Sequence, residues 1–195
     1  MRERLKDELG TVPHSDFLVY LMGPYTSFEV EALIPEGVDS EDVSLPSAQA
    51  DETTINEMVA MLRRVQGSLR ASLGVNAFLA VDADIPLDEM DAATQSIRFA
   101  RSSNVIAFIL PHLGDNLGVG MEVGAVLEDL YPDSERVLVV HSSTVSSAML
   151  GAVTQRWDAN IATYADEDEL IDQLRMFIGQ IMLQERVGNL PEKSE

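Results

Sequence analysis

The chain alternates between short, uninterrupted apolar runs and longer segments in which apolar residues recur every three or four positions. Continuous apolar runs rich in β-branched residues are typical of parallel strands that are covered on both faces. Such runs predict strands at Phe17–Met22, Val75–Val81, Val105–Leu110, Val137–Val140 and Ile161–Tyr164.

The segments between these runs have helical periodicity. Asp51–Gly74 carries one apolar face and ends on a glycine, and the last such segment, Leu170–Gly188, does the same. Strands that alternate with helices predict an α/β fold with a single doubly wound, Rossmann-like parallel sheet. We expect five strands in flavodoxin-like order, flanked by helices.

The alternation of apolar runs and helical segments covers only part of the chain, and its limits define the expected domain. We expect residues 1–15 to be an N-terminal extension, residues 16–188 to form the α/β domain, and residues 189–195 to be a disordered tail. Ser27–Ala50 is too long for an ordinary strand-to-helix loop and contains two prolines and six acidic residues. Such loops are often lids, and a solvated acidic insertion fits this composition equally well.

The charge balance excludes some partners. The chain has 33 acidic and 13 basic residues and a net charge of −20, and only Lys6 and Lys193 are lysines. This field repels nucleic-acid phosphates and anionic membranes, so we expect the protein to bind neither. The composition resembles that of cytosolic proteins from halophiles that accumulate salt, where a short Debye length screens the self-repulsion.

The sequence contains no cysteine and no long apolar stretch, and each absence excludes further classes of protein. Disulfides, thiolate metal sites and cysteine nucleophiles are excluded. No stretch approaches the roughly 20 apolar residues that span a bilayer, and the charged N-terminus does not resemble a signal peptide. We expect a cytoplasmic protein. The three histidines, His14, His112 and His141, form no metal signature, so we expect neither a metal nor another cofactor.

In open α/β sheets, ligands bind beyond the carboxyl ends of the strands. After the third predicted strand, Gly118 and Gly120 would let the backbone approach a ligand closely, and Glu122 would lie in the first turn of the next helix. A positioned, ionised carboxylate suits a glycosyl-transfer nucleophile. On spacing alone, Glu122 is better explained as a residue that stabilises the helix terminus. His141, at the end of the fourth strand, has no carboxylate at motif spacing.

At these residues the sequence resembles a known family. LGVGMEVGAV (Leu117–Val126) after VIAFIL resembles the signature of the nucleoside 2-deoxyribosyltransferase superfamily, closest to its 2-deoxynucleoside 5-monophosphate N-glycosidase branch. YLMGPY (Tyr20–Tyr25) and SSAML (Ser146–Leu150) resemble two further segments of that superfamily. The resemblance implies an enzyme that hydrolyses or transfers the N-glycosidic bond of a small nucleoside or nucleotide.

Carried over to matching positions, the resemblance implies that Glu122 is the nucleophile and that Tyr20 orients its carboxylate. Ser147 matches a serine that reaches the substrate phosphate across a dimer interface, which implies a homodimer with composite sites. With the strand-end residues included, the expected substrate contacts are Gly23, Pro24, Tyr25, Asp82, Asn116, Gly118, Gly120 and Ser147.

The sequence also departs from the family pattern. Pro24 and Tyr25 stand where the family has an Arg- and Gly-rich phosphate loop, and Asn116 replaces a phosphate-binding serine. Ser96 and Asn104 replace two family carboxylates. These departures favour an alternative, a non-catalytic nucleotide-sensing module on the same fold. An NAD-directed glycohydrolase is a third reading, which rests on fold analogy alone.

Overall fold

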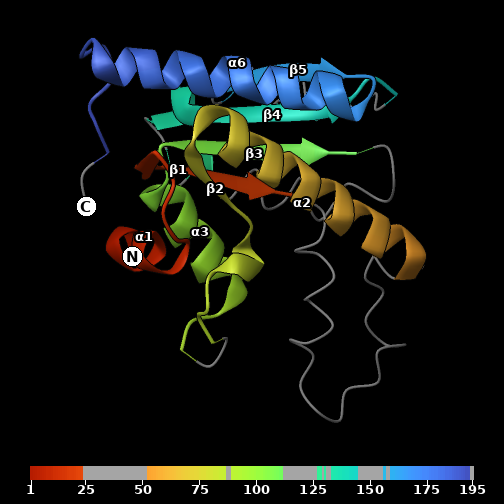
Figure 1. The fold of residues 1–195 in the computed structure, drawn as a ribbon, viewed down its shortest axis with the longest axis horizontal. Helices are drawn as coiled ribbons and strands as arrows, with labels where there is room; N and C mark the ends of the chain where they lie inside the picture. Colours follow the sequence, from red (N-terminus) through yellow and green to blue (C-terminus); the bar gives the residue numbers. More distant parts are fainter. Residues whose placement is uncertain are drawn as a thin grey trace.

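The computed structural model describes residues 1–23, 52–86, 89–111, 127–128, 130, 133–144, 156 and 159–193. Within these ranges the chain forms a parallel sheet of five strands in the order β2-β1-β3-β4-β5 (Figure 1). The predicted doubly wound α/β sheet and its flavodoxin-like order are therefore confirmed. The strands are β1 (His14–Met22), β2 (Val75–Phe78), β3 (Val105–Leu110), β4 (Val137–Ser142) and β5 (Asn160–Tyr164).

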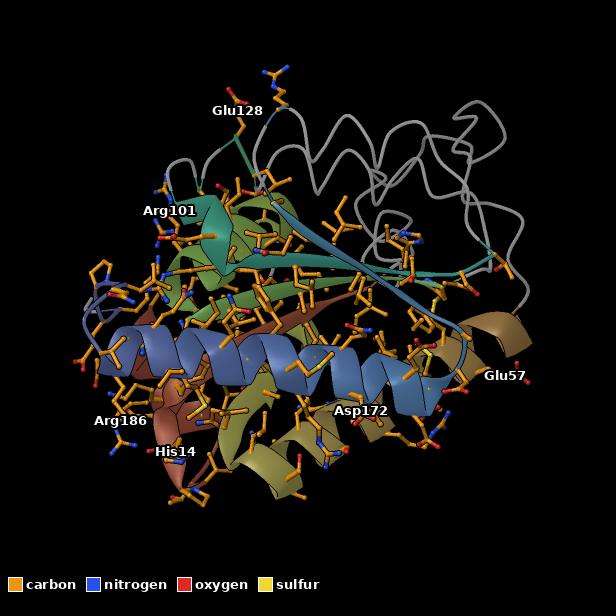
Figure 2. All side chains as sticks on the ribbon, turned by 90° about the horizontal axis from the view of Figure 1, so that it is seen from above. His14, Glu57, Arg101, Glu128, Asp172 and Arg186 are labelled. Carbon is orange, nitrogen blue, oxygen red and sulfur yellow. The ribbon has the colours of Figure 1, made fainter. Side chains whose placement is uncertain are left out.

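Helices cover both faces of this sheet, and each face has its own apolar core. Side chains of α2 and α6 pack on one face, and side chains of α1 and α3 pack on the other, as Figures 1 and 2 show. The helices are α1 (Arg2–Glu8), α2 (Glu52–Leu73), α3 (Ala92–Ser102) and α6 (Glu167–Arg186), with short 3₁₀ helices η3 (Ala80–Asp82) and η4 (Asp133–Arg136).

The two long helices end at glycines, as the sequence predicts, and α6 begins at a side-chain cap. Gly74, directly after α2, has a φ of 66°, and Gly188, after α6, has a φ of 78°. Both values lie in the left-handed region that glycine adopts without steric cost. At the start of α6, the Asp166 side chain accepts a hydrogen bond from Glu169 N at 2.9 Å, and Glu169 accepts one from Ala165 N at 2.7 Å. These two bonds satisfy backbone donors of the first turn.

The second strand is shorter than the sequence predicts. β2 ends at Phe78, and Val81 lies in η3 with 49 % of its surface exposed. The turn is closed by Asp82, whose carboxylate accepts a hydrogen bond from Leu79 N at 2.8 Å. An apolar run does not reveal such a side-chain cap, so the predicted strand extends three residues too far.

The chain ends pack onto the domain. Residues 1–15, expected as an extension, contain α1 and the start of β1, and Leu5 of α1 is fully buried. In the segment expected as a disordered tail, Leu190 is buried in the core on the α6 face. Residues 194–195, like the insertion at 27–50, lie outside the described residues.

A buried ionic network joins these ends at the amino ends of the strands. Arg136 pairs with Glu185 of α6 and donates to Asn104 O at 3.1 Å. Asn104 Nδ2 donates to both Glu185 oxygens at 3.0 Å, and its Oδ1 accepts from Arg2 at 2.9 Å and from Leu18 N at 3.0 Å. Burial lowers the pKa of Arg2, partly offset by the charge of Glu185.

Candidate functional site

The carboxyl ends of β1, β3 and β4 define the candidate site. The strand order reverses between β1 and β3, because β1 connects to β2 on one side while β3 leads to β4 on the other. Ligands of doubly wound sheets bind in the crevice at this switch point. In the sequence, the Glu122 motif (Leu117–Val126) begins seven residues after the last residue of β3. Figure 1 shows the strands pointing the same way toward this edge.

Most of the residues predicted for this site cannot be placed. Pro24, Tyr25, Asn116, Gly118, Gly120, Glu122 and Ser147 lie outside the described residues. Of the predicted site, Tyr20, Gly23 and Asp82 are described, and Gly23 directly follows the last residue of β1.

Tyr20 lies on the sheet face that is covered by α1 and α3. It shares one apolar cluster with Phe108 of β3 and with Leu127 and Leu130, which follow the Glu122 motif. Its ring stacks on Phe78 with a centroid distance of 5.1 Å. The structure therefore brings Tyr20 to the face on which the segment just after the motif packs.

The aromatic neighbours hold Tyr20 in one orientation. Its ring meets Phe99 edge-on at 5.6 Å, and Phe78 and Phe99 also meet edge-on at 5.9 Å. Tyr20 is fully buried, and its Cα pairs in register with Phe78 at the end of β2 and with Ile106 of β3. Such packing fixes the ring that the family resemblance assigns to positioning the carboxylate, and it also serves the core.

The carboxylate of Asp82 is already bonded to neighbouring residues. It pairs with Arg63 of α2, accepts from Gln66 Nε2 at 2.6 Å and closes the turn after β2 through Leu79 N. To contact a substrate, as the sequence predicts, Asp82 would have to exchange one of these partners or act through Arg63.

His141 lies at the end of β4, on the Tyr20 face. Side chains alternate along a strand: Val137 and Val139 belong to the core on the Tyr20 face, and Leu138 and Val140 belong to the other. His141 therefore points to the same side as Tyr20. It pairs in register with Leu110, the last residue of β3, and is two strand spacings, or about 10 Å, from β1.

A backbone contact fixes which ring nitrogen of His141 is available. Nδ1 lies 2.9 Å from Ser142 O, and because a carbonyl oxygen only accepts, Nδ1 must carry the proton. Nε2 is then the ring nitrogen left to contact a ligand. The sequence alone assigns no role to His141, because no carboxylate lies at motif spacing from it. Its position on the Tyr20 face becomes visible only when the burial of alternate residues along β4 is known.

The segment that follows His141 is also held in place. Ser143 N donates to Tyr164 O at 2.7 Å, and the hydroxyls of Ser142 and Thr144 lie 2.8 Å apart. Tyr164, the last residue of β5, donates to Leu110 O at 3.5 Å, and burial raises the pKa of its phenol to about 12. The ends of β3, β4 and β5 are thus tied to one another.

The structure describes Ser96 and Asn104, the two residues that stand where the resembled superfamily has carboxylates. Asn104 both donates to Glu185 and accepts from Arg2, which an ionised aspartate could not do. Ser96 lies half-buried on α3, whose N-cap is Asp91; the Asp91 carboxylate accepts from Thr94 N at 2.9 Å. Asn104 therefore has a structural role at the opposite end of the sheet from the candidate site.

The described residues contain no group of three or more His, Cys, Asp or Glu side chains placed to hold a metal ion. Among the helices that the structure describes, none is long and apolar enough to span a membrane.

These features define a doubly wound α/β protein whose candidate site lies at the strand-order reversal. The chain belongs to the family described as Domain of unknown function (DUF7509), which it matches over residues 2–194. No curated protein matches the chain.

Three solved structures illustrate what the fold is similar to. A de novo designed Rossmann 2x3 protein is 8 % identical with a TM-score of 0.44, covering 85 % of this chain and 90 % of its own. The CMP N-glycosidase BcmB of Clostridium botulinum is 8 % identical with a TM-score of 0.42, covering 82 % and 98 %. A 2-deoxyribosyltransferase of Bacillus psychrosaccharolyticus is 14 % identical with a TM-score of 0.42, covering 79 % and 90 %.

Proposed function

We propose that the protein hydrolyses or transfers the N-glycosidic bond of a nucleoside or nucleotide, with Glu122 as the reacting carboxylate. The observation that carries the proposal is the place of the LGVGMEVG motif in the sequence. It begins seven residues after the last residue of β3, and the carboxyl end of β3 lies at the strand-order reversal, where ligands of such sheets bind.

The chemistry requires an ionised carboxylate close to the anomeric carbon of the sugar. A Glu122 oxygen would attack C1′ as the bond from C1′ to the base nitrogen breaks, and the bonding electron pair would leave with the base. Water or an acceptor nucleobase would then attack C1′ and release the Glu122 carboxylate. Tyr20, packed against both Phe78 and Phe99, would position that carboxylate.

The departing base needs a proton, and His141 is the described residue best suited to supply it. As an imidazolium, it would donate its Nε2 proton to the base while Nδ1–H stays bonded to Ser142 O. Neutral Nε2 would then accept the proton of the attacking water. Because Nδ1–H is present in both protonation states, the ring keeps its orientation through the cycle.

For Ser147 we keep the role that the resemblance implies. It would contact the substrate phosphate bound to a neighbouring copy of the chain.

The proposed function is tested by base release in molar KCl, followed by chromatography. Nucleosides, deoxynucleosides, their monophosphates and NAD form the panel, and acceptor nucleobases are added in a second series to separate transfer from hydrolysis. Release from a nucleoside or a monophosphate supports the proposal. A folded protein that binds nucleotides but releases no base would instead be a sensing module.

The role of His141 has a separate test, because some bases leave without protonation. A 7-methylpurine carries its positive charge already, so His141→Ala should slow release of guanine by about 10²- to 10⁴-fold and leave release of 7-methylguanine nearly unchanged. His14→Ala, an exposed histidine at the amino end of β1, is the matched control. Equal loss with both substrates, or no loss with either, would refute the acid role without touching that of Glu122.

A further inference from the structure

The outer face of α6 carries an aligned apolar strip. Among the described residues, four large apolar side chains are strongly exposed, and three of them lie on α6 and its C-cap: Met176 at 63 %, Leu183 at 60 % and, at the C-cap, Val187 at 57 %. At about 100° of rotation per residue, these three positions fall within about 40° of one another. Their spacing of seven and four residues is that of a seam between two paired helices.

The strip is separate from the face that α6 already buries. Leu170, Leu174, Phe177, Ile178 and Ile181 pack into the core with side chains of α2. Gly179 lies between Met176 and Leu183 in the sequence, and a Cβ added there would meet no atom within 4 Å. The middle of the strip is therefore open, and a second helix could approach its backbone closely.

The charges along α6 are arranged so that the strip complements itself. No acidic residue occurs from Gln173 to Gln184, although the chain has 33 of them. Asp172 is exposed before the strip and Arg186 is exposed near its end, and Figure 2 shows them toward opposite ends of the helix. When two copies of α6 run antiparallel, the acidic end of each meets the basic end of the other.

We propose that this strip is the interface of a homodimer, formed by antiparallel pairing of α6 with α6 of a second copy. The two-fold axis passes between Gly179 and Gln180, so Met176 packs on Leu183 of the second copy and Leu183 on its Met176. The same register places Asp172 opposite Val187 of the second copy, beside its Arg186. One surface thus meets itself, as a two-fold interface requires.

This dimer differs from the one that the Ser147 resemblance implies. α6 covers the sheet face opposite Tyr20, so the pairing would not build a composite active site. High salt should strengthen it, because each copy carries a net charge of −20 and molar salt shortens the Debye length to about 3 Å.

The test is sedimentation velocity of the full chain in molar KCl over a concentration series. Wild type should show a monomer–dimer equilibrium, and Leu183→Glu should weaken the dimer at least about tenfold, because it adds a carboxylate at the core of the interface. Val81→Glu is the matched control: it introduces the same charge at the fourth exposed apolar residue, which lies in η3. Circular dichroism verifies that each variant is folded.

A charge exchange tests the register, at the lowest KCl concentration at which wild type still dimerises, because molar salt screens an exposed ion pair. Asp172→Arg and Arg186→Asp should each weaken the dimer, and the double variant should restore it. A wild type that stays monomeric throughout, or a dimer that survives Leu183→Glu as well as it survives Val81→Glu, would overturn the proposal. Base release by Leu183→Glu should equal that of wild type, so this outcome is independent of the proposed activity.

Discussion

Removal of Arg136 should strongly destabilise the fold. Its guanidinium is almost fully buried, pairs with Glu185, and donates to the backbone oxygens of Asn104 and Pro191. It thereby joins the start of β3 to the end of α6 and to the C-terminal segment. In Arg136→Gln, the Glu185 carboxylate stays in a site where water cannot replace the lost charge.

The expected loss of stability follows from the burial of the Arg136–Glu185 pair. Only 2 % of the Arg136 side chain and 9 % of the Glu185 side chain are exposed, and removing one partner of a buried ion pair costs about 3–5 kcal/mol. Glu185 keeps two hydrogen bonds from Asn104 and the charge of Arg2, so we expect the lower figure, about 3 kcal/mol. For a chain of this size that lowers the Tm by about 6–12 °C.

The assay is thermal and urea unfolding followed by far-ultraviolet circular dichroism. The matched control is Arg64→Gln, which breaks an Arg–Glu pair of 2.7 Å whose side chains are 59 % and 32 % exposed. That change should cost about 1 kcal/mol or less, and molar salt should reduce its effect further. If Arg136→Gln costs no more than Arg64→Gln, the network does not stabilise the fold in the way its burial suggests.

Three further predictions concern single residues. Gly74→Ala should destabilise the protein by about 1–2 kcal/mol, because φ is 66° there and a Cβ would lie 2.9 Å from Pro13 Cγ. Gly67→Ala, within α2 and in open space, should instead stabilise it by about 0.5–1 kcal/mol in the same urea titration. Tyr164 ionises at about pH 12 when folded and near pH 10 when unfolded, so the unfolded chain loses its proton first and stability falls as pH rises from about 10 to about 12. Urea midpoints at pH 9, 10 and 11 should therefore decline less in Tyr164→Phe than in wild type; an equal decline would contradict the assigned burial effect.

The sequence is sufficient for the sheet and its long helices because their signals are local. Continuous apolar runs mark β1, β3 and β4, and helical periodicity closed by Gly74 and Gly188 marks α2 and α6. The end of β2 is missed because Asp82 caps its own turn, and an apolar residue, Val81, continues the pattern beyond the strand.

Contacts between distant residues leave no such local signal. In the sequence, Arg2 is one of several charged residues near the N-terminus. In the structure it is buried and donates a hydrogen bond to Asn104, 102 positions away. The candidate site depends on the same kind of information. Tyr20 and His141 share one sheet face only because β1, β3 and β4 lie side by side, whereas the Glu122 motif is visible in the sequence alone.

The central claim is that Glu122 breaks the N-glycosidic bond, and one comparison tests it most directly. Base release in molar KCl is measured for wild type, Glu122→Gln and Glu128→Gln. Glu128 is the matched control, because it lies six residues later and its exposed side chain pairs with Arg156 at 3.3 Å. We predict release by wild type and by Glu128→Gln, and a loss on the order of 10³-fold or more in Glu122→Gln with an unchanged Tm. Undiminished release by Glu122→Gln, or none by wild type from any nucleoside or nucleotide, would contradict the account.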